Sequence, residues 1–429
     1  MNYCKYGLTI LVGLILAACG GNNDNPNPRG NLIGEPTVIG STLTTGQLDA
    51  ITLATGLQTL TGPAKCNVTV AQINYQTPGV QPGEMTNASG AVLIPSGAGC
   101  SGPFPLVAYG RVTNLFKTHT NADPKSPETI LLMTFLAAQG YAVVATDYLG
   151  YALSGYPYHP YCHADSEANA VIDSIRAARQ AASSLSLALN GKVMLIGYSQ
   201  GGHASMATQR LIERENSGEF NLVAAAHMAG PYNMSAALLD GVANPINVDV
   251  QHNVPFQITS WQKVYGNVYN KASDVFRSPY DSYIETLLPT LLDPAALAKL
   301  LPGGTPTQAR DAMFLSSYLT DLANNPNNGT TIAGKKQDLL GWNPKAPITL
   351  CGGSGDPTVR FSINAQVVYD DFRSRGVANV ALVDVDAKVQ QKYGDVLKKD
   401  PTTYYNSYHG QYESPFCLQA AKAMLDLYK

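Results

Sequence analysis

A pentapeptide with a serine at its centre, Gly197-Tyr198-Ser199-Gln200-Gly201, limits the fold of this chain more than any other feature. It ends an apolar run at residues 193–196 and opens a helical pattern over residues 200–212. A strand that turns this sharply into a helix needs glycine on both sides of the turn, because side chains there would collide with neighbouring backbone. The pattern therefore predicts that Ser199 stands at the tip of a strand-to-helix turn, in a strained conformation.

The chain around this turn alternates short β-branched runs with longer helical patterns from residue 66 onward. Such alternation is typical of a mostly parallel sheet with helices on both faces. The first two predicted strands form an antiparallel hairpin around a Pro/Gly-rich turn, and the other six are parallel. The eight predicted strands are residues 67–75, 87–94, 104–109, 141–148, 192–198, 222–227, 347–351 and 380–386.

A segment of about 110 residues, roughly 230–345, separates the sixth and seventh predicted strands. This is far longer than an ordinary connection, so it must have structure of its own. Its Leu/Ala-rich stretch at residues 287–301 is interrupted by prolines, which predicts short helices. We expect a helical cap over an apolar acyl pocket, with Leu291 and Leu297 on the apolar face. A packed helical subdomain without that role is the alternative.

The N-terminal sequence has the pattern of an export signal. Lys5 precedes an apolar run at residues 8–16, which leads into Leu16-Ala17-Ala18-Cys19 and resembles a bacterial lipobox. The run is too short to remain as a membrane-spanning helix. We therefore expect a signal peptide at 1–18, a lipid-modified Cys19, a flexible tether at 19–45 and a catalytic domain at 46–429.

The expected location follows from the same segment. Residue 20 is Gly20 rather than aspartate, which in Gram-negative families accompanies transfer to the outer membrane. The interpretation is a lipid-anchored protein of the cell envelope, or one released from it.

Of the seven cysteines, five remain after Cys4 and Cys19 are set aside, so at least one stays unpaired. Two flank the predicted hairpin, and two others could fasten the ends of the catalytic region, but the connectivity is open. None shows CxxC spacing or a clustered histidine, so we expect no metal and no cofactor. The five cysteines are Cys66, Cys100, Cys162, Cys351 and Cys417.

A serine nucleophile needs a base and an acid that orients the base, in the chain order serine, acid, histidine for this kind of turn. Asp356 lies on a Gly-rich loop directly after the seventh predicted strand, and Asp384 and Asp386 are weaker alternatives. His409 follows the eighth predicted strand and is the last histidine of the chain. These residues predict a catalytic triad with Ser199.

The other histidines receive structural interpretations. His203 lies one helical turn beyond Ser199 and is expected to point into helix packing. His159 and His163 are expected to fix a loop, and His227 to be a satisfied group at a strand end. His119 and His252 have no distinguishing context.

Hydrolysis through such a serine also needs two donors for the oxyanion. The first is the backbone N–H of Gln200, the residue after the nucleophile. The second is expected after the third predicted strand, where we choose Arg111, with Val112 nearly equivalent. A surface ion pair of the Arg111 side chain would leave its backbone role intact.

The motifs together resemble the secretory lipase branch of the α/β-hydrolases, which includes fungal lipase A and bacterial exported esterases. The resemblance covers roughly residues 66–425 and is carried by the extended turn at 197–203 and by Asp147-Tyr148-Leu149-Gly150-Tyr151, His159-Pro160-Tyr161, Gly341-Trp342-Asn343-Pro344 and His409-Gly410. It implies an α/β-hydrolase fold with a helical cap, a triad of Ser199, Asp356 and His409, no metal, and hydrolysis of carboxylic esters.

The sequence thus favours an exported carboxylesterase or lipase that acts through an acyl-enzyme on Ser199. A net charge of −3 gives no reason to expect nucleic acid as a partner, whereas a small-molecule or lipid ester is expected. A polyester depolymerase, an exported peptidase of the same fold and a non-catalytic surface lipoprotein remain alternatives.

Overall fold

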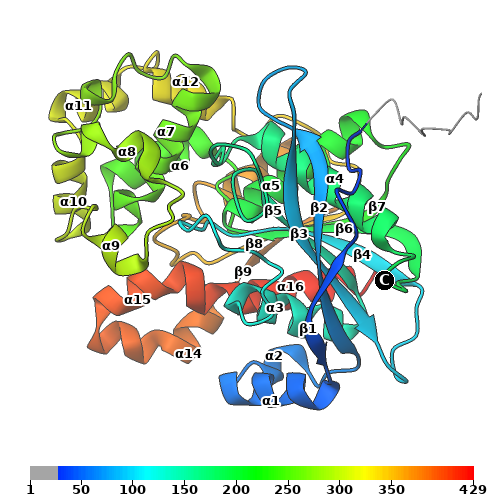
Figure 1. Cartoon of the computed structure of the whole chain (residues 1–429). Coiled ribbons are helices and arrows are strands. Elements are labelled where there is room, and N and C mark those ends of the chain that lie inside the picture. The colour runs from blue at the N-terminus through cyan, green and yellow to red at the C-terminus, as the bar shows by residue number, and fades with distance from the viewer. Residues whose placement is uncertain (1–27) are drawn as a thin grey trace, which may run out of the picture.

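The computed structural model describes residues 28–429 of the chain. The predicted signal peptide, Cys19 and the first part of the predicted tether lie outside the described residues. The described part forms a twisted sheet covered by helices, and a separate group of helices lies beside the sheet (Figure 1).

Across residues 28–429 the strands form one sheet of nine, in the spatial order β1-β2-β3-β5-β4-β6-β7-β8-β9. All eight predicted strands are confirmed: β2 and β3 form the antiparallel hairpin, and β4 to β9 are parallel to one another. The strands are β1 (Thr37–Leu43), β2 (Asn67–Pro78), β3 (Met85–Ser96), β4 (Phe104–Gly110), β5 (Ala142–Tyr148), β6 (Leu189–Tyr198), β7 (Asn221–Met228), β8 (Ile348–Gly352) and β9 (Val380–Asp384).

The ninth strand corrects two predictions, the count of eight strands and the tether at 19–45. Strand β1 pairs antiparallel with β2 at the edge of the sheet, so this part of the chain is not a flexible tether. Its sequence is rich in Thr, Val and Ile, which suit a strand, but most of its residues are exposed and show no alternation. Without a buried face, the strand leaves no periodic signal in the sequence.

Helices cover both faces of the sheet. Helices α4, α5 and α13 share one apolar core with the sheet, and α3 and α16 share the core on the opposite face. The helices outside the β7–β8 connection are α1 (Thr45–Thr55), α2 (Gln58–Thr61), α3 (Pro127–Phe135), α4 (Ala164–Ala181), α5 (Gln200–Glu215), α13 (Ala365–Ser374), α14 (Asp386–Lys399), α15 (Pro401–Ser407) and α16 (Ser414–Leu425).

The chain between β7 and β8 forms the helical group at one side of the sheet, which we call the cap (Figure 1). It has an apolar core of its own, which includes Trp261, Phe276 and Phe314. Its helices are α6 (Met234–Ala243), α7 (Asn253–Tyr265), α8 (Ile284–Leu287), α9 (Pro294–Ala298), α10 (Pro306–Met313), α11 (Ser316–Asn324) and α12 (Gly329–Lys335).

The Leu-rich stretch of the cap does not form the apolar face expected of it. Leu297 is 3% exposed and packs inside the cap core, whereas Leu291 is 76% exposed. Leu287 and Leu288 are also buried, whereas Leu292 is exposed like Leu291, so the short helices and their connections bury only part of the stretch, which the sequence pattern alone does not reveal.

Two disulfides join distant parts of the chain. Cys66 pairs with Cys100 at the hairpin, and Cys351 of β8 pairs with Cys417 of α16. Both pairings agree with the sequence interpretation, and among residues 28–429 Cys162 is the free, buried cysteine. Over the same residues, no helix is long and apolar enough to span a membrane.

Candidate active site

Ser199 occupies the turn between β6 and α5 with strained backbone geometry. Its φ is +59° and its ψ is −124°, values that side-chain-bearing residues rarely adopt. A hydrogen bond fixes the turn to the neighbouring strand: the Ser199 amide donates to the Met228 carbonyl of β7 at 3.0 Å. The predicted strand-to-helix turn is therefore present, and the Ser199 side chain stands at its tip.

The glycines around Ser199 allow close backbone packing. A Cβ on Gly197 would overlap the carbonyl oxygen of Gly201, and a Cβ on Gly201 would overlap that of Gly110 at the end of β4. The first turn of α5 is thus pressed against the adjacent strand. Glycine is required at both positions by this approach rather than by an unusual φ.

A continuous hydrogen-bonded chain joins the serine, the histidine and the aspartate that the sequence singled out. His409 Nε2 lies 2.7 Å from Ser199 Oγ, and His409 Nδ1 lies 2.6 Å from Asp356 Oδ2. The second carboxylate oxygen, Oδ1, accepts the Thr358 amide at 2.8 Å and the Val359 amide at 3.2 Å. These backbone donors fix the orientation of the acid.

The two alternative acids, Asp384 and Asp386, bond to segments that carry the site but form no hydrogen bond with His409. Asp384 Oδ1 accepts the Ser354 amide at 3.0 Å. Asp386 Oδ1 accepts the Tyr408 hydroxyl at 2.5 Å. The structure therefore brings Asp356, rather than Asp384 or Asp386, to the histidine.

His409 lies in a π-helical turn, Tyr408–Glu413, between α15 and α16. The hydroxyl of Tyr198 donates to the His409 carbonyl at 2.5 Å and anchors this turn to β6. Burial lowers the pKa of His409, but the charge of Asp356 and its hydrogen bond raise it, and the net direction is upward from 6.5. The imidazole is therefore set to accept a proton readily.

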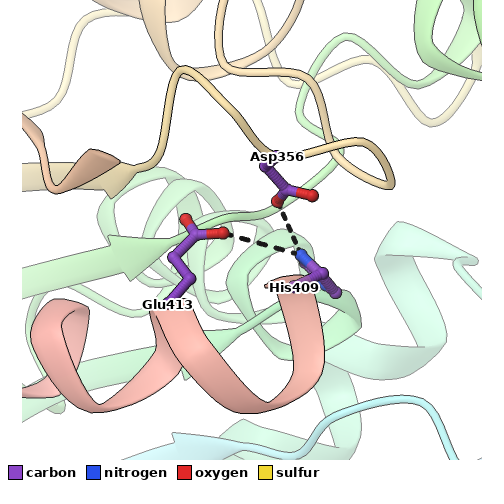
Figure 2. A group of neighbouring side chains, drawn as sticks. All are labelled: Asp356, His409 and Glu413. Atoms are coloured by element: carbon purple, nitrogen blue, oxygen red, sulfur yellow. Dashed lines mark hydrogen bonds and ion pairs between the residues drawn. The ribbon is translucent and has the colours of Figure 1, made fainter. Parts of the chain in front are cut away.

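Glu413 is a third acidic or basic side chain at this site, and the sequence reasoning missed it. Figure 2 shows its carboxyl group beside Asp356 and His409. Glu413 Oε2 lies 4.0 Å from His409 Nδ1, and the side chain is fully buried. One signal could have revealed it: on a helical turn, the fourth residue after His409 returns to the same face.

Gln200, the first residue of α5, is locked by its side chain. Its Nε2 donates to Glu167 Oε1 at 2.7 Å and to His159 Nε2 at 2.6 Å. His159 Nδ1 in turn lies 2.9 Å from the Leu149 carbonyl, and burial lowers the pKa of His159 to about 3. The neutral imidazole can therefore donate through Nδ1 and accept through Nε2, which holds Gln200 next to Ser199.

Arg111 and Val112 follow β4, directly beside the turn. The Val112 amide donates to Glu128 Oε1 at 2.8 Å, so this alternative oxyanion donor is already engaged. The Arg111 side chain is fully buried and its Nη1 lies 3.7 Å from Asp147 Oδ1. The surface ion pair considered for Arg111 is thus wrong, because the guanidinium lies in the interior over the Tyr151 ring.

Two cavities meet at Ser199 and differ sixfold in volume. The narrow cavity, about 80 Å³, runs under the cap between α6, α7 and the loop after Asp356. Its apolar lining includes Leu238, Val250 and Val254. The wide cavity, about 490 Å³, includes His409 in its lining together with residues after β4 and from α3 and α16.

The remaining histidines agree with their structural interpretations where contacts are present. His203 is buried, with Nδ1 3.2 Å from Glu167 Oε2 and Nε2 2.9 Å from the Gln337 carbonyl. His227 bonds Ser205 and Gln209, and His163 caps α4. His119 lines the wide cavity, a placement that its sequence context did not indicate.

Comparison with known proteins gives one family. Residues 119–241 match the family model described as Secretory lipase. The rice cell wall degrading esterase LipA from Xanthomonas oryzae is 34% identical; the match covers 94% of this chain and 100% of that chain, with a TM-score of 0.82. No curated protein sequence matches the chain closely enough to count as a relative.

More distant structures share the fold. A hydrolase from Legionella pneumophila is 20% identical, with a TM-score of 0.77, and the match covers 92% of this chain and 98% of that chain. Candida antarctica lipase A in its closed state is 15% identical, with a TM-score of 0.57, and the match covers 90% of this chain and 85% of that chain.

The nine-stranded, mostly parallel sheet and its flanking helices define an α/β-hydrolase, and the chain is a carboxylic ester hydrolase. More specifically, it belongs to the secretory lipase-like family that includes the Xanthomonas oryzae LipA esterase.

Proposed function

We propose that this protein is an exported serine carboxylesterase in which Ser199 is the nucleophile, His409 the general base and Asp356 the orienting acid. The observation that carries the proposal is the unbroken chain from Ser199 Oγ through His409 to Asp356 Oδ2, with links of 2.7 and 2.6 Å. Both links fall within hydrogen-bonding range, so proton transfer needs no rearrangement of the side chains.

The proposed reaction proceeds in two halves. His409 Nε2 takes the Ser199 proton as Oγ attacks the ester carbonyl, and Asp356 stabilises the imidazolium. The tetrahedral intermediate collapses, the alcohol leaves with the proton from His409, and an acyl-enzyme remains. In the second half, His409 takes a proton from water as the water attacks the acyl-enzyme carbonyl. The proton then passes from His409 to Ser199 Oγ, which releases the carboxylic acid and restores the free serine.

The oxyanion is assigned to backbone amides. The Gln200 N–H belongs to the first turn of α5, where amides have no partner within the helix, and the helix dipole favours negative charge there. The locked Gln200 side chain keeps this amide in place. Arg111 remains our proposed second donor, because its backbone lies beside the turn while the Val112 amide is held by Glu128.

The two cavities can hold the two halves of an ester substrate, the acyl group and the alcohol. The departing alcohol must receive its proton from His409, and His409 lines the wide cavity but not the narrow one. We therefore assign the alcohol to the wide cavity and the acyl group to the narrow one. The proposed substrate is an ester of a short acyl group and a large alcohol. The wall-degrading role in the name of LipA adds esters of cell-wall polymers to this class.

Export and lipid anchoring through Cys19 form a separate part of the proposal. Two disulfides support export, since such bonds persist mainly in oxidising compartments outside the cytoplasm, and the lipobox-like sequence before Cys19 is the basis for the anchor. Cys19→Ala is expected to stop incorporation of labelled palmitate and to release the protein from the membrane fraction. Unchanged labelling would reject the anchor and leave the enzymatic proposal intact.

The nucleophile is tested with Ser199→Ala. We expect the variant to lose hydrolysis of p-nitrophenyl acetate and labelling by a fluorophosphonate, while its unfolding temperature stays near that of the wild type. Ser205→Ala, on the buried side of the same helix, is the matched control and should keep both activities. Wild-type turnover by folded Ser199→Ala would refute the proposal.

A further inference from the structure

Glu413 is the acid next to the proposed triad that the mechanism above does not use. It ends the π-helical turn, four residues after His409, and its side chain is fully buried. One carboxylate oxygen of Glu413, one carboxylate oxygen of Asp356 and one ring nitrogen of His409 all lie within 4.8 Å of one another. Within residues 28–429, both Glu413 oxygens lack a partner with hydrogen-bond geometry.

Asp356 and Glu413 receive different numbers of hydrogen bonds. Asp356 receives two backbone amides and the His409 Nδ1–H, which together stabilise a negative charge. In the described part of the chain, no bond of standard hydrogen-bond geometry reaches the Glu413 carboxyl group, and a buried carboxylate without such donors is strongly disfavoured. The Gly353 backbone and the Tyr198 hydroxyl lower the pKa of Glu413, but burial and the charge of Asp356 outweigh them. When two carboxyl groups share one buried site, one of them keeps its proton. The charge therefore belongs on Asp356 and the proton on Glu413.

The groups facing Glu413 agree with a neutral acid. Tyr198 of β6, Tyr232 after β7 and Tyr408 of the same turn surround it and bring no positive charge. His409 is the basic side chain within 4.0 Å, and it is already bound to Asp356. Burial, and then the charge of Asp356, raise the pKa of Glu413 well above its usual range.

We propose that Glu413 is a positioning residue: a neutral carboxylic acid that donates a hydrogen bond to the neighbouring Asp356 carboxylate and holds it against His409. A carboxylate oxygen can accept two hydrogen bonds, so Asp356 can serve both neighbours. This inference rests on the proposed triad. It adds that Asp356 and Glu413 together carry one negative charge, which limits how strongly His409 holds a proton before substrate binds; the nearby Asp249 carboxylate acts on His409 in addition.

Activity tests the positioning role. E413L removes the donor and keeps the buried position filled with a somewhat larger apolar side chain, and it is expected to lower kcat about tenfold with KM unchanged, the typical effect of losing a hydrogen bond to a charged group. E413Q keeps a neutral donor and is expected to rescue most of that loss. Wild-type kcat in folded E413L would overturn the role. D173N, a buried acid distant in the scaffold, controls for destabilisation alone.

Two pH measurements test the neutral charge state. The acid limb of kcat/KM in E413Q should coincide with that of the wild type, because no charge is removed. A downward shift of about one pH unit or more would show that Glu413 was ionised and would overturn the proposal.

The second measurement needs no turnover, so it separates this inference from failure of the triad. A raised folded-state pKa stabilises the native protein fully below the unfolded pKa, and that stabilisation is lost as pH rises. The unfolding temperature of E413Q should therefore increase relative to the wild type from pH 4.5 upward. A difference independent of pH would overturn the neutral acid even if Ser199→Ala behaved as expected.

Discussion

At the scale of single residues, the site is arranged before any substrate binds. Ser199 has a φ of +59°, its amide donates a hydrogen bond to the Met228 carbonyl, and its Oγ already lies 2.7 Å from His409 Nε2. Strain of this kind persists only where the surrounding structure enforces it. Here the enforcement is the contact between Gly201 and the backbone of Gly110, which leaves no room for a side chain.

Replacement of Gly201 by alanine should therefore break the scaffold rather than the chemistry. The new Cβ would overlap the Gly110 carbonyl, so we expect the free energy of unfolding to fall by more than about 3 kcal/mol, measured by urea denaturation. Gly218→Ala is the matched control, since a Cβ there meets no atom within 4 Å and should change stability by less than about 0.5 kcal/mol. Equal stability of the two variants would contradict this account of the turn.

The charge next to His409 predicts the pH dependence of turnover. In the proposed mechanism His409 acts as a base only when neutral, and its pKa is raised from 6.5. The value of kcat/KM for p-nitrophenyl acetate should thus fall as pH decreases through a pKa above 6.5. Asp356→Asn removes the charge that raises this pKa, so residual activity should have its acid limb at lower pH. An acid limb below 6.5 in the wild-type enzyme would contradict the prediction.

Sequence reasoning located residues whose position follows directly from a strand end. Ser199 directly follows β6, and Asp356 lies on the loop after β8, so the strand pattern places both at the carboxyl ends of the parallel strands. Glu413 escaped this reasoning because it lies inside a helical segment, where its depth depends on the π-helical turn. The structural environments of Arg111 and His119 were also missed, since burial of a polar residue depends on distant partners.

At the scale of elements, the proposed acid and base lie on segments that are tied together covalently. The disulfide between Cys351 and Cys417 links β8, just before the Asp356 loop, to α16, just after the His409 turn. It therefore spans the same two segments that the hydrogen bond from His409 to Asp356 joins. The strands themselves followed from their sequence pattern, whereas β1 did not, because an exposed edge strand has no alternating apolar face.

Removing either disulfide should lower the stability of the protein, but only one of the two removals should also lower kcat. The Cys351→Ser/Cys417→Ser double variant opens a loop of 66 residues, and loop-closure entropy predicts a loss of about 4 kcal/mol in the free energy of unfolding. The Cys66→Ser/Cys100→Ser variant opens 34 residues and should lose a similar amount. Only the first should also lower kcat in the folded protein, because only it loosens the helix that follows His409. Equal kcat values at a temperature where both are folded would contradict this role.

At the scale of the whole molecule, the binding cavities belong to no single segment. The narrow cavity needs the cap and the loop after β8, and the wide cavity needs the segments after β4 together with the C-terminal helices. This explains why the sequence predicted a cap but assigned its lining to Leu291 and Leu297. The residues that line a cavity depend on how separate segments pack together. Leu291 instead faces solvent, and Leu297 packs in the cap core.

The unequal cavities predict opposite responses to growth of the two halves of an ester. Each buried methylene is worth about 0.8 kcal/mol, so kcat/KM should rise roughly three- to fourfold per carbon over a short acyl range and then fall. Enlarging the alcohol at constant acetyl group should not produce this early fall, since the wide cavity is about 490 Å³. Leu238→Trp fills the narrow cavity and should reduce butyrate turnover far more than acetate turnover, while Leu291→Trp on the exposed cap surface should change neither. If Leu238→Trp altered the dependence on the alcohol rather than on the acyl chain, the assignment of the two cavities would have to be reversed.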